Sequence, residues 1–128
     1  LEKYAKSLEV EPEKITFNAM DEALLKRAMA IVEKNMDNIE FSTDEFAREM
    51  NMSRSNLHLK LKAITGESTI DFIRKIRFNE AAKLLKDGRY TVAEVSTMVG
   101  FNTPSYFATS FKKYFGCLPT EYIKKSKG

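Results

Sequence analysis

Two stretches of this chain repeat one pattern of hydroxyl, apolar and glycine residues, and leave polar and basic side chains on the opposite helical face. The first copy has Ser53, Leu57, Leu61 and Gly66, and the second has Thr103, Phe107, Phe111 and Gly116. A hydroxyl residue caps a helix start, apolar residues four apart share one face, and glycine suits the left-handed residue after the last turn. Because a shorter helix precedes each copy across a tight turn, the pattern predicts two helix-turn-helix units that grip DNA at two places.

The exposed face of the first repeated helix carries the first set of candidate DNA contacts. These candidates are Arg54, Ser55, His58, Leu59 and Lys62. Arg54 could pair with guanine or a phosphate, and His58 could donate or accept a hydrogen bond at a base edge. A surface histidine without a role is the alternative for His58, and a solvated surface lysine is the alternative for Lys62.

The second repeated helix offers a corresponding set of side chains. The candidates there are Asn102, Thr103, Ser105, Tyr106, Thr109, Lys112 and Lys113. Phe107 and Phe111 are expected in the core, and Tyr106 could lie partly in the core instead of at DNA. The two lysines could hold phosphates, with a solvated surface again as the alternative.

The charge of the chain is unevenly distributed. Residues 1–50 hold 7 Lys+Arg and 12 Asp+Glu, a net of −5, whereas residues 51–128 hold 14 and 6, a net of +8. The basic part begins where the first repeat copy begins. Such asymmetry favours a polyanionic partner for the second part, although a solvated basic surface would give the same count.

Capping signals divide the chain into elements that would position these residues. Helix starts are expected at Asp21, at the capping box from Ser42 to Glu45, at Ser53, at Ser68, at the capping box from Thr91 to Glu94, at Thr103-Pro104 and at Pro119. The helix from Ser68 to about Lys86 would be a connector roughly 26 Å long. Its apolar residues Ile70, Ile73, Ile76, Ala81, Leu84 and Leu85 are expected to pack inward. The predicted fold is all-α, with about seven helices and two helix-turn-helix subdomains joined by a long central helix.

The expected boundaries are a connector from an absent upstream domain at 1–20, a first subdomain at 21–67, the connecting helix at 68–87 and a second subdomain at 88–128.

The two units align with an offset of 49 before the turn and 50 after it, so the second turn is one residue longer. Asn51 then matches Gly100, and Leu57 matches Phe107. Duplication explains these matches better than convergence on capped amphipathic helices.

Several of these segments together resemble the AraC/XylS family of bacterial transcription regulators. The resemblance is carried by Val99–Phe107, Phe111–Gly116, Pro119 and Tyr122, and upstream by Met52–Leu57, Leu61–Gly66 and Ile76-Arg77. It covers roughly residues 20–124 and looks most like the C-terminal output domain of Bacteroidetes hybrid two-component sensors. It implies seven helices, with the second helix of each unit in the major groove. It also implies neighbouring carbohydrate-uptake genes.

The sequence departs from the family pattern at several positions. Leu59 and Thr109 stand where the family often has basic residues, so specificity is expected to depend more on apolar contacts and DNA shape. Ser96 stands where a tightly packed alanine is usual, and Leu118 replaces a common cap residue. The absent basic residues leave an alternative function, a helical protein-interaction module with weak or non-specific DNA affinity.

The residues argue against an enzyme. One histidine, one cysteine and no Gly-rich phosphate loop leave no catalytic or metal-binding constellation, so no cofactor and no metal are expected. Cys117 is expected to be a small packing residue, and the reducing cytoplasm is the expected compartment. No stretch approaches the roughly 18 apolar residues of a membrane span.

The leading hypothesis is therefore a sequence-specific double-stranded DNA-binding domain of a transcription regulator, with activation as the family habit. Its recognition helices are expected at about 53–65 and 103–115. Because the chain begins at Leu1 rather than Met, we expect a piece of a longer protein, which would be membrane-anchored if it were a hybrid sensor. RNA polymerase is an expected partner, and dimerisation is expected through upstream regions. The target sequence and the inducing signal cannot be inferred from these residues.

Overall fold

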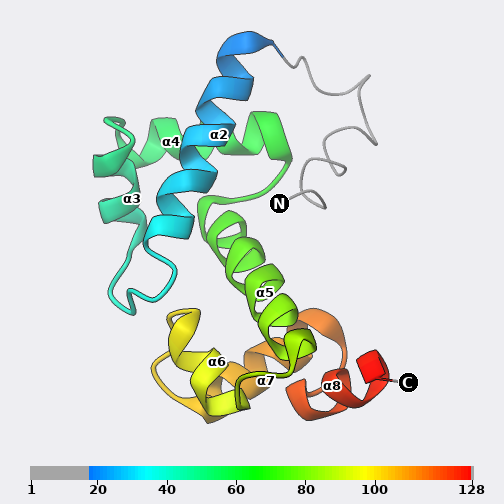
Figure 1. Ribbon diagram of the computed structural model, residues 1–128. Helices are drawn as coiled ribbons and strands as arrows, with labels where there is room; N and C mark the ends of the chain where they lie inside the picture. The colour runs from blue at the N-terminus through cyan, green and yellow to red at the C-terminus, as the bar shows by residue number, and fades with distance from the viewer. Residues whose placement is uncertain (1–17, 128) are drawn as a thin grey trace. The chain divides into compact units, whose positions relative to one another are not determined.

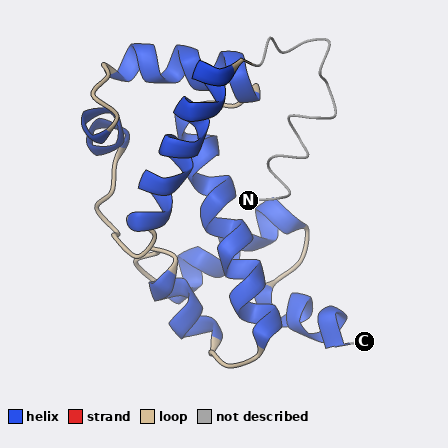
Figure 2. Ribbon diagram, turned by 45° about the horizontal axis from the view of Figure 1, so that its top comes forward, coloured by secondary structure: helices blue, strands red, loops and turns tan. Residues whose placement is uncertain are grey.

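The computed structural model describes residues 18–127, which form seven helices (Figure 1). They are α2 (Ala19–Lys34), α3 (Thr43–Glu49), α4 (Arg54–Thr65), α5 (Thr69–Asp87), α6 (Val92–Met98), α7 (Pro104–Phe115) and α8 (Pro119–Lys127). No strand occurs between residues 18 and 127 (Figure 2). The prediction of an all-α fold with about seven helices and a long central helix is confirmed.

The first of these helices begins two residues earlier than predicted. The side chain of Asn18 caps α2 by accepting a hydrogen bond from the Asp21 backbone N–H at 2.9 Å. Asparagine is among the best N-cap residues, so the start moves from Asp21 to Ala19. Most of the predicted connector, residues 1–17, lies outside the described residues.

The helices belong to two compact units. Unit 1 contains α2, α3, α4 and α5 as far as Ile76. Unit 2 contains the rest of α5 from Arg77, together with α6, α7, α8 and the segment Met36–Glu40. The segment that joins α2 to α3 in sequence is thus part of unit 2.

Unit 1 is built around apolar side chains from all four of its helices. Phe46 is fully buried, and its ring lies 5.7 Å from that of Phe41 and 6.0 Å from that of Phe72, measured between centroids. Leu57 and Leu61 of α4 are also fully buried, as the spacing of the first repeat copy predicts. One face of α4 is therefore fixed to the core and the opposite face is left exposed.

The prediction that Ile70 packs inward is wrong. Its side chain is 57% exposed, whereas the neighbouring Thr69 is buried. The buried residues at this end of α5 are Thr69, Phe72, Ile73 and Ile76, which follow the i, i+3, i+4, i+7 spacing of one helical face. Ile70 lies off that face because it is one position out of this register.

Unit 2 has an aromatic core centred on Phe78 of α5. Its ring lies 6.5 Å from that of Phe107 and 6.2 Å from that of Phe111, both on α7, and all three residues are fully buried. The buried cluster consists of Phe78, Ala81, Leu85, Val95, Val99, Phe107 and Phe111. The core positions predicted for α7 are thus confirmed, and Figure 1 shows α6, α7 and α8 gathered at the carboxyl-terminal end of α5.

After α2, the helices begin at the residues that the sequence predicts. Ser53 accepts a hydrogen bond from the Asn56 N–H and Thr103 accepts one from the Tyr106 N–H, each at 3.1 Å. Thr91 and Glu94 form a complete capping box. Of the box predicted at Ser42 and Glu45, the structure shows the Ser42 hydroxyl accepting from the Glu45 N–H at 3.2 Å, while the Glu45 carboxylate lies 3.6 Å from Arg48.

The turns of the two units share one backbone geometry. Asn51 and Gly100 both have a left-handed backbone, with φ of 57° and 81°. In each turn, the next residue donates its backbone N–H to the carbonyl five residues earlier. Met52 donates to Ala47 at 3.0 Å, and Phe101 donates to Ser96 at 2.9 Å. Met52 and Phe101 therefore correspond with an offset of 49, whereas the caps Ser53 and Thr103 correspond with an offset of 50. The extra residue of the second turn is Asn102, which lies between Phe101 and Thr103.

Within residues 18–127, no helix combines the length and the apolar character that crossing a membrane requires. The predicted packing role of Cys117 agrees with its burial in unit 2.

Candidate nucleic-acid interface

The candidate residues of unit 1 lie together on the exposed side of α4. Arg54, Ser55, His58, Leu59 and Lys62 are all exposed. Opposite them, Leu57, Leu61 and Ile64 are buried in unit 1. The amphipathic pattern therefore places all five predicted contacts on one accessible helical surface.

The structure adds an ion pair that the sequence analysis missed. The Nε atom of Arg54, at the first position of α4, lies 3.2 Å from Oδ1 of Asp44 on α3. The pair links the two helices of the helix-turn-helix and holds one edge of the guanidinium. A bidentate partner such as guanine or phosphate needs two parallel N–H donors, and the two terminal nitrogens provide them. An acidic residue in the first turn of the preceding helix was the available signal, but the pairing depends on how α3 meets α4.

The candidate residues of unit 2 lie at the start of α7 and along it. Asn102, Thr103, Ser105, Tyr106, Thr109, Lys112 and Lys113 are all exposed. Two of the hydroxyls bond within the helix. Thr103 caps it, and the Thr109 hydroxyl donates to the Ser105 carbonyl at 3.0 Å. Tyr106 is 58% exposed while its ring lies 5.5 Å from that of Phe101, so it is accessible and also contacts an aromatic neighbour.

The charges on the two repeated helices have one sign. Helix α4 carries Arg54, Lys60 and Lys62, helix α7 carries Lys112 and Lys113, and neither helix contains Asp or Glu. Lys60, which the sequence analysis passed over, is also exposed. Since cations on one helix surface bind phosphates, these two surfaces suit a polyanion.

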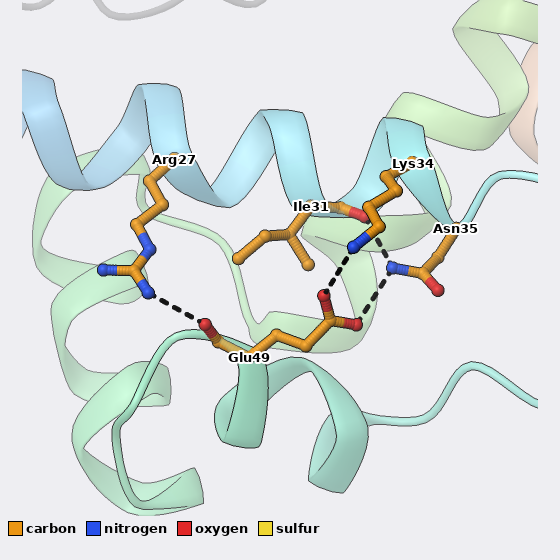
Figure 3. A network of polar contacts seen from close by, with 5 residues as sticks. All are labelled: Arg27, Ile31, Lys34, Asn35 and Glu49. Atoms are coloured by element: carbon orange, nitrogen blue, oxygen red, sulfur yellow. Dashed lines mark hydrogen bonds and ion pairs between the residues drawn. The ribbon is translucent and has the colours of Figure 1, made fainter.

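A polar network in unit 1 holds α3, the first helix of its helix-turn-helix, against α2. Figure 3 shows Glu49 of α3 facing α2. Its carboxylate accepts a hydrogen bond from Asn35 Nδ2 at 3.1 Å and lies 3.9 Å from Lys34 Nζ, while its backbone carbonyl accepts from Arg27 at 3.0 Å. Glu49 is two residues before Asn51, in the turn between α3 and α4. The network therefore fixes α3 close to the turn that sets the orientation of α4.

A half-buried arginine has the corresponding role in unit 2. Arg77 donates to the Asn38 carbonyl at 2.8 Å and to the Gly100 carbonyl at 3.4 Å. Burial lowers the pKa of Arg77 from its ordinary value, and the nearby Asp37 carboxylate opposes that shift. Arg77 therefore ties the segment Met36–Glu40 to the turn between α6 and α7. The sequence analysis used this residue only for the family resemblance, and no local signal reveals bonds to partners 39 and 23 positions away.

Residues 18–127 contain no cluster of three or more His, Cys, Asp or Glu side chains that could hold a metal ion. The described surface instead presents exposed basic and hydrogen-bonding groups on the two capped helices α4 and α7. Two helix-turn-helix units with such helices define a DNA-binding domain that contains two helix-turn-helix motifs.

Comparison with known proteins gives the family. A family model described as "Helix-turn-helix domain" matches residues 46–125. The chain belongs to the AraC-type helix-turn-helix family, and the resemblance stated from the sequence is confirmed. The chain is a DNA-binding domain of the transcription-regulator type, and its family is one of regulators, not of enzymes.

Three relatives illustrate the similarity. The chain is 38% identical over 120 residues to Histidine kinase P4 of Formosa agariphila, covering 94% of this chain and 9% of that protein. It is similar to the solved C-terminal domain of AraT, a response regulator from Geobacillus stearothermophilus, with TM-score 0.74, 30% identity and coverage of 80% and 84%. The DNA-binding domain of AdpA, solved with a target DNA, has the same fold, with TM-score 0.71, 24% identity and coverage of 80% and 90%.

The chain spans 9% of the Formosa protein and 34% or less of the next curated relatives it matches. The matched proteins include a transcriptional regulator, a response regulator and a histidine kinase, so the family includes regulators of two-component systems.

Proposed function

We propose that this domain recognises a specific double-stranded DNA sequence by placing α4 and α7 in the major groove. The observation that supports this most directly is the chemistry of the two helices. Each is 12 residues long, begins at a hydroxyl cap, buries one apolar face and exposes no acidic side chain. Both helices thus offer donors and cations on an accessible surface, as a groove-reading helix requires.

In this proposal the contacts divide by chemistry. Arg54 and His58 contact base edges or phosphates at the amino-terminal half of α4, and Ser55 and Leu59 face the bases beside them. On α7 the base-facing residues are Asn102, Thr103, Ser105, Tyr106 and Thr109. Lys62, Lys112 and Lys113, in the last turns of the helices, hold phosphates.

We also propose the larger context. The domain is the output part of a longer regulator, and its relation to the Formosa histidine kinase favours a hybrid two-component sensor. In such a protein, regions outside this chain receive the signal and form a dimer, and the DNA-bound domain activates transcription through RNA polymerase in the cytoplasm. Two unlike recognition helices favour an asymmetric site for each copy of the domain.

A binding titration tests the central proposal. A site is first selected from random duplexes with the 128-residue chain, and its affinity is then compared with that of a scrambled duplex by fluorescence anisotropy. The affinity is expected to fall with salt, with a log–log slope of about −0.9 for each phosphate neutralised. A chain that binds selected and scrambled duplexes equally well, or with no salt dependence, would refute sequence-specific recognition.

A pair of variants identifies the helix that reads the DNA. Arg54→Ala combined with His58→Ala is expected to weaken binding to the selected site about tenfold or more, since one good base contact accounts for about 1–3 kcal/mol. Lys26→Ala is the control, because Lys26 is an equally exposed cation of unit 1 that lies on α2 and pairs with Glu22. If the double variant binds as tightly as the control, α4 does not contact the DNA.

A further inference from the structure

The exposed face of α4 has an apolar side chain near its centre. Leu59 is two positions from both Leu57 and Leu61, which places it about 200° around the helix from each. Leu57 and Leu61 are fully buried, whereas Leu59 is 64% exposed. Leu59 is therefore the one large apolar side chain on this face of α4, and the exposed Ala63 one turn later adds only a methyl group.

The surroundings of Leu59 argue against a protein partner and for DNA. The exposed residues one turn away from it are polar or small: Ser55, Asn56, Lys62 and Ala63. No acidic side chain occurs on this helix. Because this surface is basic, it binds a polyanion, and any apolar contact of Leu59 is made while α4 lies against the phosphates of DNA. In the major groove, the C5-methyl group of thymine is the one apolar group that a base pair presents.

We propose that Leu59 selects thymine by contact with its C5-methyl group, which gives the site of unit 1 a required T·A base pair. This inference rests on the proposed entry of α4 into the major groove. It goes further by naming the base and the group recognised. Leucine cannot donate or accept a hydrogen bond, so its discrimination depends on the methyl group alone.

Replacement of thymine by uracil tests this directly, because it removes the methyl group and leaves the base-pairing atoms unchanged. Each thymine of the selected site is replaced singly, and affinities for the 128-residue chain are measured. At one position the wild-type chain is expected to lose about fourfold in affinity, as expected for burial of one methyl group. The Leu59→Ala variant is expected to bind the thymine and uracil duplexes at that position equally.

Ile70→Ala is the matched control. Ile70 is an apolar residue of the same unit with a similar exposure of 57%, but it lies at the start of α5. This variant is expected to retain the full uracil penalty. The control separates loss of a specific contact from any general effect of removing exposed apolar surface.

The outcomes separate the inference from the proposed function. If the wild-type chain binds its selected site but tolerates uracil at every position, or if the site lacks thymine, thymine selection by Leu59 is refuted while sequence-specific binding stands. The same holds if Leu59→Ala keeps the uracil penalty. If no duplex is preferred over random DNA, the proposed function itself fails.

Discussion

Replacing Ser96 with alanine is expected to stabilise the domain, and the reason lies in one buried hydroxyl. Ser96 is 1% exposed on α6, and its Oγ atom finds no hydrogen-bond partner among residues 18–127. A hydroxyl that loses water without gaining a partner costs about 1–3 kcal/mol. Alanine also has the higher helix propensity, by up to about 0.5 kcal/mol. We therefore expect Ser96→Ala to raise the free energy of unfolding by about 1–3 kcal/mol.

The internal repeat supplies the control for this experiment. With the offset of 49, Ser96 corresponds to Ala47 of unit 1, which is 3% exposed and whose carbonyl accepts the equivalent turn hydrogen bond. Ala47→Ser places the same hydroxyl in the same local geometry. It is expected to lower the free energy of unfolding by a similar amount, so the two substitutions should have opposite signs.

Urea denaturation followed by circular dichroism measures both effects, and amide hydrogen exchange in α6 shows whether the gain is local to unit 2. For a domain of about 100 residues, 1 kcal/mol corresponds to a change of about 4–8 °C in Tm. Because Ser96 is buried on α6, DNA affinity should not change. A Ser96→Ala variant of equal or lower stability would show that the hydroxyl has a partner, and the reasoning would be refuted.

Two further predictions concern the turns and the network around them. Gly100→Ala is expected to cost about 2 kcal/mol or more in urea denaturation, because an added Cβ would lie 2.6 Å from the Met36 carbonyl oxygen and the backbone is left-handed. The corresponding Asn51→Gly should change stability by less than about 1 kcal/mol, and an equal loss at both positions would contradict the packing argument. Glu49→Ala is expected to lose about 1 kcal/mol with the hydrogen bond from Asn35, whereas Glu49→Gln, which keeps an acceptor, should lose less. A Gln variant as unstable as the Ala variant would assign the effect to the charge instead.

The helix starts and the exposed faces of α4 and α7 could be predicted because they are decided locally. A cap such as Ser53 or Thr103 bonds to a backbone N–H three residues away. Burial of Leu57 and Phe107 follows from helical periodicity once the start is known. These signals need no information from distant parts of the chain, so the candidate surface could be predicted together with the fold.

Other features depend on contacts between distant segments, and the sequence did not reveal them. The ion pair between Asp44 and Arg54 requires the angle between α3 and α4. The membership of Met36–Glu40 in unit 2 depends on hydrogen bonds from Arg77 to segments far away in sequence. Ile70 was misassigned because two apolar registers overlap at the start of α5, and only packing selects between them.

The two turns show how a repeated motif diverges under different packing. Both Asn51 and Gly100 adopt the left-handed backbone that joins the helices of each unit. Asparagine is one of the few residues with a side chain that tolerates this backbone, and Asn51 is exposed. At Gly100, by contrast, the Met36 carbonyl and the Arg77 guanidinium occupy the space of a side chain. The motif therefore requires only a left-handed residue, and the requirement for glycine in unit 2 comes from the segment that packs against its turn.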